Sequence, residues 1–232
     1  MKRMEERKGY FSRGEKLLWL FSALLILTSF LLFDRGSYLT LIASLIGVTS
    51  LIFNAKGNAI GQLLMILFSI LYGIISYGFA YYGEMITYLG MTAPMALFAL
   101  ISWLRNPYQK GRAEVKVHRL KKKELLWMLL WTVFVTVIFY DILAYFENAN
   151  LIPSTLSVTT SFVAAYLTFL RSPYFALAYA ANDLILILLW SLASLSDRSY
   201  LSVVICFCVF LLNDLYGFFN WRRMQKRQGA NE

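Results

Sequence analysis

The sequence predicts an all-α, polytopic membrane protein of about eight transmembrane helices, arranged as one extra helix plus a 3+1+3 parallel repeat. The first observation is composition, because 59% of the residues are hydrophobic and 15% are charged, whereas soluble domains average about 45–50% and about 25%. The second is that eight apolar stretches of membrane-spanning length account for most of the 232 residues. The third is the placement of the basic residues along the chain.

Lysine and arginine fall almost entirely on one side when the eight stretches are drawn across a membrane. If the N-terminus is cytoplasmic, 20 of the 22 basic residues lie inside and only Arg35 and Arg198 lie outside. The positive-inside rule therefore predicts a multi-pass protein of the cell membrane with both termini in the cytoplasm. The same pattern predicts the lipid bilayer as a partner and argues against nucleic acid, because the net charge of +9 lies beside the anionic inner leaflet.

The predicted helices follow the apolar stretches in order. They are 17–33, 38–54, 59–82, 84–104, 125–146, 151–170, 174–195 and 199–221. Pro153 and Pro173 fall at helix starts, where proline is tolerated. Pro94 lies in the middle of the fourth helix, so we expect a kink there and a flexing point for gating.

Connection lengths divide the chain into five parts. These are a basic tail with the extra helix (1–37), a three-helix bundle (38–104), a basic cytoplasmic loop with a linker helix (105–146), a second three-helix bundle (147–223) and a cytoplasmic tail (224–232). Each bundle has a basic residue in a turn (Lys56, Arg171) and a tryptophan followed by arginine near its end (Trp103, Trp221). The sequence separation between the two turn residues is similar to that between the two tryptophans, which predicts an internal duplication. The single linker helix makes the two copies parallel.

Metal and cofactor chemistry are not expected. Cys206 and Cys208, two apart on a helix, point in different directions, and His118 is the only histidine. The chain has no P-loop, so direct ATP drive is not expected, and an enzyme is not the preferred interpretation. The remote alternative is an intramembrane aspartyl-type enzyme with Asp183 and Asp214 as its dyad.

Those two acids are the strongest candidates for a binding role. Asp183 lies nine residues into one helix and Asp214 seven residues from the end of another, so their predicted depths are similar, and no basic residue lies at that depth. An asparagine precedes each acid, and aromatic residues suited to stacking on a flat cation are nearby. The predicted substrate-binding residues are Tyr72, Phe175, Tyr179, Asn182, Asp183, Asn213 and Asp214. The alternative is that these polar groups only hydrogen-bond neighbouring helices.

Several short stretches resemble one family of bacterial vitamin transporters. They are residues 54–58, 72–77, 82–84, Pro94-Met95, Trp103 and 216–222. Over residues 38–224 the chain resembles the PnuC family. This resemblance implies a SWEET-like fold and uptake of nicotinamide riboside across the inner membrane by facilitated diffusion with alternating access. It also implies trapping of the substrate by a cytoplasmic kinase and, by analogy, a possible homotrimer.

The chain departs from the family's W-x-x-W-x-x-x-N pattern. Asn182 can fill the asparagine position, but the tryptophan positions hold Phe175 and Ala178. Shifting the register by one gives Ala176, Tyr179 and Asp183, again without tryptophan. Another vitamin, such as thiamine or riboflavin, therefore stays an alternative substrate. Nicotinamide riboside and thiamine are cations, which the buried acids favour, and riboflavin is neutral.

Overall fold

The computed structural model describes residues 10–78, 82–109, 113–148 and 150–230, and these are mainly helical. The elements are α1 (Arg13–Phe33), α2 (Tyr38–Ala55), α3 (Ile60–Gly78), α4 (Tyr82–Ile86), the π-helix η1 (Thr87–Thr92), α5 (Ala93–Arg105), α6 (Lys122–Tyr145), α7 (Leu151–Phe169), α8 (Tyr174–Ser194), the 3₁₀-helix η2 (Arg198–Tyr200) and α9 (Leu201–Gly229). Eight helical spans in these residues are long and apolar enough to cross a membrane. The prediction of an all-α protein with about eight transmembrane helices is confirmed.

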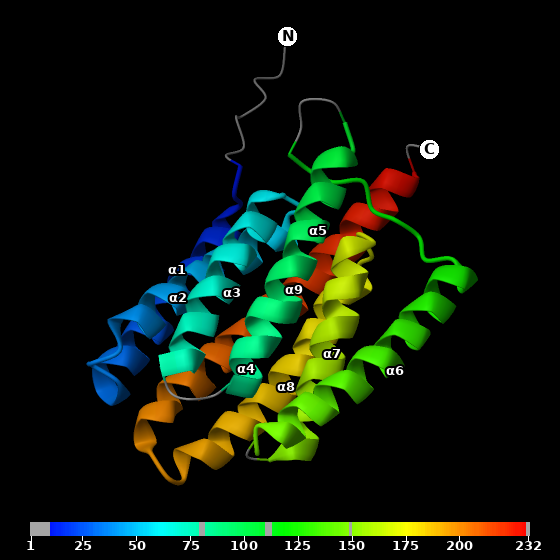
Figure 1. Cartoon of the computed structure of the whole chain (residues 1–232). Coiled ribbons are helices and arrows are strands. Elements are labelled where there is room, and N and C mark those ends of the chain that lie inside the picture. Colours follow the sequence, from blue (N-terminus) through cyan, green and yellow to red (C-terminus); the bar gives the residue numbers. More distant parts are fainter. Residues whose placement is uncertain (1–9, 79–81, 110–112, 149, 231–232) are drawn as a thin grey trace.

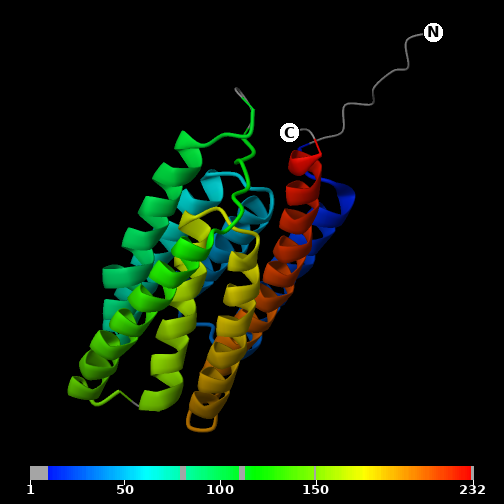
Figure 2. The same ribbon diagram turned by 90° about the vertical axis from the view of Figure 1, so that its right-hand side faces the viewer.

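Six helices form a closed ring in which each packs against the next (Figures 1 and 2). The order around the ring is α2, α3, α5, α7, α8 and α9, and α9 returns to α2. Outside the ring, α1 packs against α2 and α9, and α6 packs against α7. Most side chains of α6 are exposed and apolar, as expected for a helix that faces lipid.

The end of the chain differs from the prediction. The last helix was expected to stop at residue 221, but α9 continues to Gly229, so most of the expected tail is helical. Tertiary contact explains the extension, because Gln228 accepts a hydrogen bond from the Val117 backbone N–H at 2.8 Å and Arg227 pairs with Glu114. Hydropathy detects only the part of a helix that lies in lipid.

The expected kink at Pro94 takes the form of a π-helix. In the described residues the fourth span consists of α4, η1 and α5, and Pro94 stands in the first turn of α5. The N–H of Ala93 bonds to the carbonyl of Tyr88, five residues earlier. Proline cannot donate the next helical hydrogen bond, and the wider turn places the irregular backbone just before it.

Two helix-ending turns lie at the end of the ring that carries both termini. Gly57, after α2, and Arg171, after α7, both have left-handed backbone with φ of 63° and 57°. The Gly57 carbonyl accepts a hydrogen bond from the N–H of Val115 at 2.9 Å, and the Arg171 carbonyl accepts one from His118 at 3.0 Å. One segment between α5 and α6 therefore bridges both turns.

Two tryptophans make matching contacts beneath these turns. The Trp221 indole N–H donates to the carbonyl of Asn54 near the end of α2 at 2.7 Å. The Trp103 indole N–H donates to the carbonyl of Thr168 near the end of α7 at 2.9 Å. These paired contacts join residues 38–104 to residues 147–223 at two places, and the internal duplication stays a prediction.

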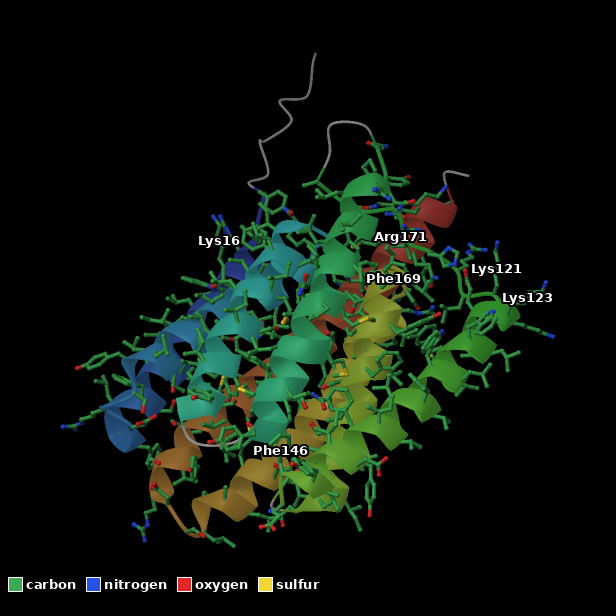
Figure 3. All side chains as sticks on the ribbon, viewed as in Figure 1. Lys16, Lys121, Lys123, Phe146, Phe169 and Arg171 are labelled. Atoms are coloured by element: carbon green, nitrogen blue, oxygen red, sulfur yellow. The ribbon has the colours of Figure 1, made fainter. Side chains whose placement is uncertain are left out.

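The bridging segment, residues 113–121, is here called the strap. Its Val115 side chain is buried, and its backbone also bonds to Gln228 of α9. Figure 3 shows Lys121, Lys123, Arg171 and Lys16 gathered at this end, which is here called the termini end. The role of the basic loop was not predicted from sequence; in the structure its second half covers the termini end of the ring.

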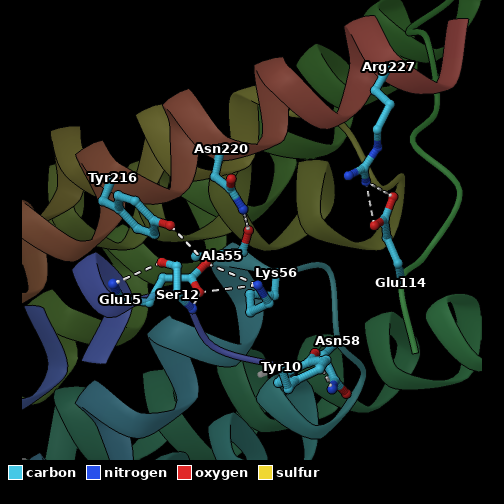
Figure 4. A network of polar contacts seen from close by, with 10 residues as sticks. All are labelled: Tyr10, Ser12, Glu15, Ala55, Lys56, Asn58, Glu114, Tyr216, Asn220 and Arg227. Carbon is cyan, nitrogen blue, oxygen red and sulfur yellow. Dashed lines mark hydrogen bonds and ion pairs between the residues drawn. The ribbon is translucent and has the colours of Figure 1, made fainter. Parts of the chain in front are cut away.

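A partly buried ion pair attaches α1 to the ring (Figure 4). The Glu15 carboxylate accepts from the Lys56 ammonium at 3.0 Å and from the Tyr216 hydroxyl at 2.9 Å. Deeper in the bundle, the Asn213 side-chain amide donates to the Ser22 hydroxyl at 2.9 Å. Polar contacts therefore hold the extra helix against α2 and α9, in addition to the packing of apolar side chains.

Candidate functional site

A cavity of about 80 Å³ lies inside the ring and is here called the central cavity. Lining residues come from both three-helix bundles, with Leu143 of α6 and Asn148 of the following loop completing the wall. The residues discussed below are Glu84, Thr87, Tyr88, Thr92, Ser157, Tyr179, Asn182, Asp183, Trp190 and Asp214. This volume holds several water molecules and is small for a nucleoside, so a ligand of that size requires the cavity to widen.

A second cavity of about 300 Å³, here called the vestibule, adjoins the first. The two share wall residues that include Glu84, Asn148 and Trp190. Phe146 also lines the vestibule, and Figure 3 places it at the end of the molecule away from Lys121 and Arg171. The central cavity therefore continues toward the end opposite the termini.

Asp183 and Asp214 face each other across the interface between α8 and α9. Their side chains are 3% and 5% exposed, and their carboxyl groups lie within hydrogen-bonding reach of each other. The Oδ2 atom of Asp183 is buried and has no hydrogen-bond partner among the described residues. The pair therefore offers a free acceptor on the wall of the cavity.

Asn182 stands beside the pair on α8 and is held in place by α7. Its side-chain oxygen accepts from the Ser157 hydroxyl at 3.1 Å and from the Thr160 hydroxyl at 2.9 Å. Because two donors occupy the oxygen, the amide N–H₂ is the end left to donate to a ligand. Tyr179, Asn182 and Asp183 share one helix face by their i, i+3, i+4 spacing.

Aromatic rings complete the wall around the acids. Tyr179 and Trp190 come from α8, and Tyr88 comes from η1. No lysine, arginine or histidine of the described chain is among the lining residues. An anionic, aromatic cavity without basic side chains suits a flat cation through ion pairing and cation–π attraction.

The structure brings four of the seven candidate residues together on this wall. They are Tyr179, Asn182, Asp183 and Asp214. The other three lie elsewhere: Tyr72 packs on Tyr88 behind the wall, with ring centroids 4.8 Å apart, and Asn213 faces Ser22 of α1. Phe175 packs between the strap and the cavity.

Phe175 belongs to an aromatic plug with Trp103 and Trp221. The Phe175 ring lies 5.0 Å from the Trp221 ring and 6.3 Å from the Trp103 ring, centroid to centroid. Val115 of the strap and Met224 of α9 are buried in the same cluster. The plug closes the termini end of the ring, so Phe175 is placed to seal the path rather than to line the cavity.

Glu84 is an acidic lining residue that the sequence analysis did not include among its candidates. It stands at the start of the predicted helix 84–104, and in the structure it lines the central cavity, the vestibule and a third cleft beside Tyr72. The α4–η1 geometry turns it and Tyr88 inward. Its position directly after the conspicuous Tyr82-Gly83 pair was the one available signal.

Comparison with known proteins gives similarity to one family of transporters. The family described as "Nicotinamide mononucleotide transporter" matches residues 37–223, which leaves α1 outside the match. A Neisseria mucosa protein named "Nicotinamide riboside transporter PnuC" is 26% identical over 217 residues, covering 92% of this chain and 82% of its own. A Haemophilus influenzae protein of the same name is 23% identical over 192 residues, covering 82% of each chain.

The fold has a solved counterpart. A structure described as "Crystal structure of the Vitamin B3 transporter PnuC" has a TM-score of 0.81 and 24% identity, and the match covers 95% of both chains. Each protein found is a transporter. The alternative of an aspartyl-type enzyme receives no support from these comparisons.

Proposed function

This chain belongs to the nicotinamide mononucleotide transporter family and is a multi-pass membrane transporter, and we propose that its substrate is nicotinamide riboside. The cavity inside the helix ring is the proposed binding site. We propose facilitated diffusion, as the resemblance to the family implies, and the sequence has no P-loop that would point to direct ATP drive. The proposed binding residues are Tyr179, Asn182, Asp183 and Asp214.

The negative charge of the central cavity is the observation that best supports the proposed substrate. Nicotinamide riboside has a fixed pyridinium charge, which complements Asp183 and Asp214. Nicotinamide mononucleotide adds a phosphate, which proteins usually bind with arginine or lysine. Since neither lines the described cavity, its charge favours the riboside over the mononucleotide.

Thiamine and riboflavin stay weaker alternatives. Thiamine is also a cation, but no relative found is named for it, and riboflavin lacks the positive charge that would compensate the acids. The relatives named for nicotinamide riboside support the riboside over both.

Alternating access is supported by the unequal ends of the ring. The plug and the strap close the termini end, and the vestibule extends the cavity toward the other end. In the proposed cycle the two bundles rock about the central site until the plug separates. Pro94, next to η1, is the proposed flexing point because η1 supplies Thr87, Tyr88 and Thr92 to the cavity wall.

The proposed function is tested with purified protein in liposomes that have no ion gradient. Labelled nicotinamide riboside, nicotinamide mononucleotide, thiamine and riboflavin are supplied in parallel. We expect the riboside alone to enter until its inner and outer concentrations are equal. Asp183→Asn should reduce this uptake, and Asp141→Asn, at an exposed position of α6 outside the cavity, should not.

Uptake of the mononucleotide at the same rate as the riboside would contradict the charge argument. Uptake of thiamine or riboflavin alone would show that this vitamin, and not the riboside, is the substrate. Accumulation only when an ion gradient is imposed would contradict facilitated diffusion.

Assembly and cell biology extend the same proposal. We propose that a cytoplasmic kinase traps the substrate, which would appear as label retained only in cells that contain the kinase.

We also propose a homotrimer, for which the exposed apolar face of α6 offers a contact surface. Native mass spectrometry of the purified protein gives the copy number directly.

A further inference from the structure

When no ligand is present, two ionised carboxylates in the central cavity would repel each other. Asp183 and Asp214 are almost fully buried, and their carboxyl groups lie within hydrogen-bonding reach. Two ionised carboxylates at that separation in a medium of low dielectric constant repel each other strongly. A proton between them removes one negative charge and supplies the hydrogen bond.

No neighbouring side chain supplies a compensating positive charge. Among the described residues, the titratable groups that interact with the pair are Tyr88 of η1, Tyr179 of α8, and Cys206 and Cys208 of α9, and Glu84 of α4 lines the same cavity. In the described residues, the cavity linings contributed by α2, α3, α6 and α7 are apolar or hydroxyl side chains. Compensation must therefore come from a proton or from an incoming cation.

Asp183 supplies the second, independent observation. Its Oδ2 atom is buried on the cavity wall without a hydrogen-bond partner among the described residues. Leaving a buried carboxylate oxygen without a partner is unfavourable, so such an atom is expected to have a ligand in the working cycle. A positive ring placed against it meets that requirement.

We propose that the empty Asp183–Asp214 pair holds a proton which the substrate's cation displaces, so that proton and cation compete for the same two carboxyl groups. This inference rests on the proposed function for the identity of the cation. On binding, the carboxyl O–H bond breaks and the proton passes to water in the cavity, while one positive charge enters with the ligand. The pair with its proton and the pair with its bound cation carry the same total charge. Because the pair takes up a proton again after the cation leaves on the other side, the inference adds proton exchange to the proposed cycle; without a pH gradient, uptake still ends at equal concentrations.

Proton release on binding has a defined pH dependence. Below the pH at which the pair loses its proton, affinity for the cation rises with pH by up to about tenfold per unit, because one proton leaves per ligand bound. Above that pH the affinity is constant. A ligand of the same shape without the charge has no reason to displace the proton.

The test is calorimetric titration of the purified full-length protein with nicotinamide riboside over a range of pH. Each titration is made in two buffers of different ionisation enthalpy, which gives the number of protons released. We expect about one proton per ligand for the unaltered protein. We expect none for neutral dihydronicotinamide riboside, which serves as the matched ligand. Asp214→Asn should weaken binding and abolish proton release, and Asp141→Asn should change neither.

Binding with an affinity independent of pH and no released proton would overturn the inference while leaving the proposed function intact. Failure of the riboside to bind would instead overturn the proposed function. Infrared spectroscopy then tests the inference without a ligand: the empty protein should show a protonated-carboxyl band that Asp214→Asn and Asp183→Asn each remove. Absence of that band in the correctly folded, monodisperse protein would overturn the inference whatever the substrate is.

Discussion

Single tryptophan side chains hold the two bundles together at the termini end. Trp221 is 0% exposed and Trp103 is 2% exposed, and each indole N–H reaches a carbonyl of the opposite bundle. Those carbonyls belong to the last turns of α2 and α7, where each also accepts a backbone N–H from the turn that ends the helix. Each tryptophan thus combines apolar packing with a hydrogen bond to a carbonyl at the end of a helix.

Replacing Trp221 with alanine tests this arrangement. We expect a loss of roughly 3–5 kcal/mol of stability, because a large buried side chain leaves a cavity and its carbonyl partner loses a hydrogen bond. Trp221→Phe should cost less, since it keeps most of the packing. The measurement is thermal unfolding in detergent, with Trp131→Ala on the exposed face of α6 as the control. Equal losses for Trp221→Ala and Trp131→Ala would contradict the assigned role.

At the level of the elements, η1 is the irregular segment closest to the proposed site. Its Thr87, Tyr88 and Thr92 side chains line the cavity, and Pro94 follows directly. A π-helical turn carries one extra residue, so converting it to α-helix rotates the side chains before it relative to those after it. Such a change would alter the cavity wall without moving α5 as a whole.

Pro94→Ala tests whether this segment acts in gating. An internal proline disfavours a continuous α-helix by about 3 kcal/mol, so the alanine variant should favour a straight, regular fourth span. We therefore expect unchanged or higher thermal stability but slower riboside uptake in liposomes. Pro153→Ala, in the first turn of α7, is the matched control and should transport normally. Normal uptake by Pro94→Ala would remove Pro94 from the gating proposal.

At the scale of the whole molecule, the two ends of the ring differ in charge and in closure. The strap, the plug and most basic residues lie at the termini end, and the vestibule opens toward the other end. With the basic end in the cytoplasm, as the positive-inside rule predicts, the vestibule lies on the outer side. The structure then corresponds to a transporter closed toward the cytoplasm.

Cysteine labelling measures this orientation. In a Cys208→Ala background, Arg198→Cys and Lys121→Cys place exposed thiols at opposite ends. A membrane-impermeant maleimide added to intact cells should label the first and reach the second only after the membrane is opened. The reverse result would place the termini outside and invert the proposed direction of access.

Much of the fold follows from local chemistry. Apolar runs and basic turns predict the eight spans, because each span must satisfy its own backbone hydrogen bonds and its charges must stay in water. The similar depths of Asp183 and Asp214 were also readable, since helical rise converts sequence distance into depth.

The sequence does not predict how each helix is rotated about its axis. This rotation decides which candidate residues line the cavity and which do not. Asn213 and Asp214 are adjacent in sequence, but one bonds to α1 and the other faces the cavity. In a bilayer both faces of a helix are apolar, so hydrophobic periodicity gives little information about which face is inward.

The sequence by itself determined the class of protein, its spans and the presence of buried acids. Only the tertiary structure decided that these acids form a pair, that Glu84 joins them on the wall and that the strap and plug close one end. The physical reason is that solvation acts on each residue separately, whereas a cavity exists only where side chains from several helices meet.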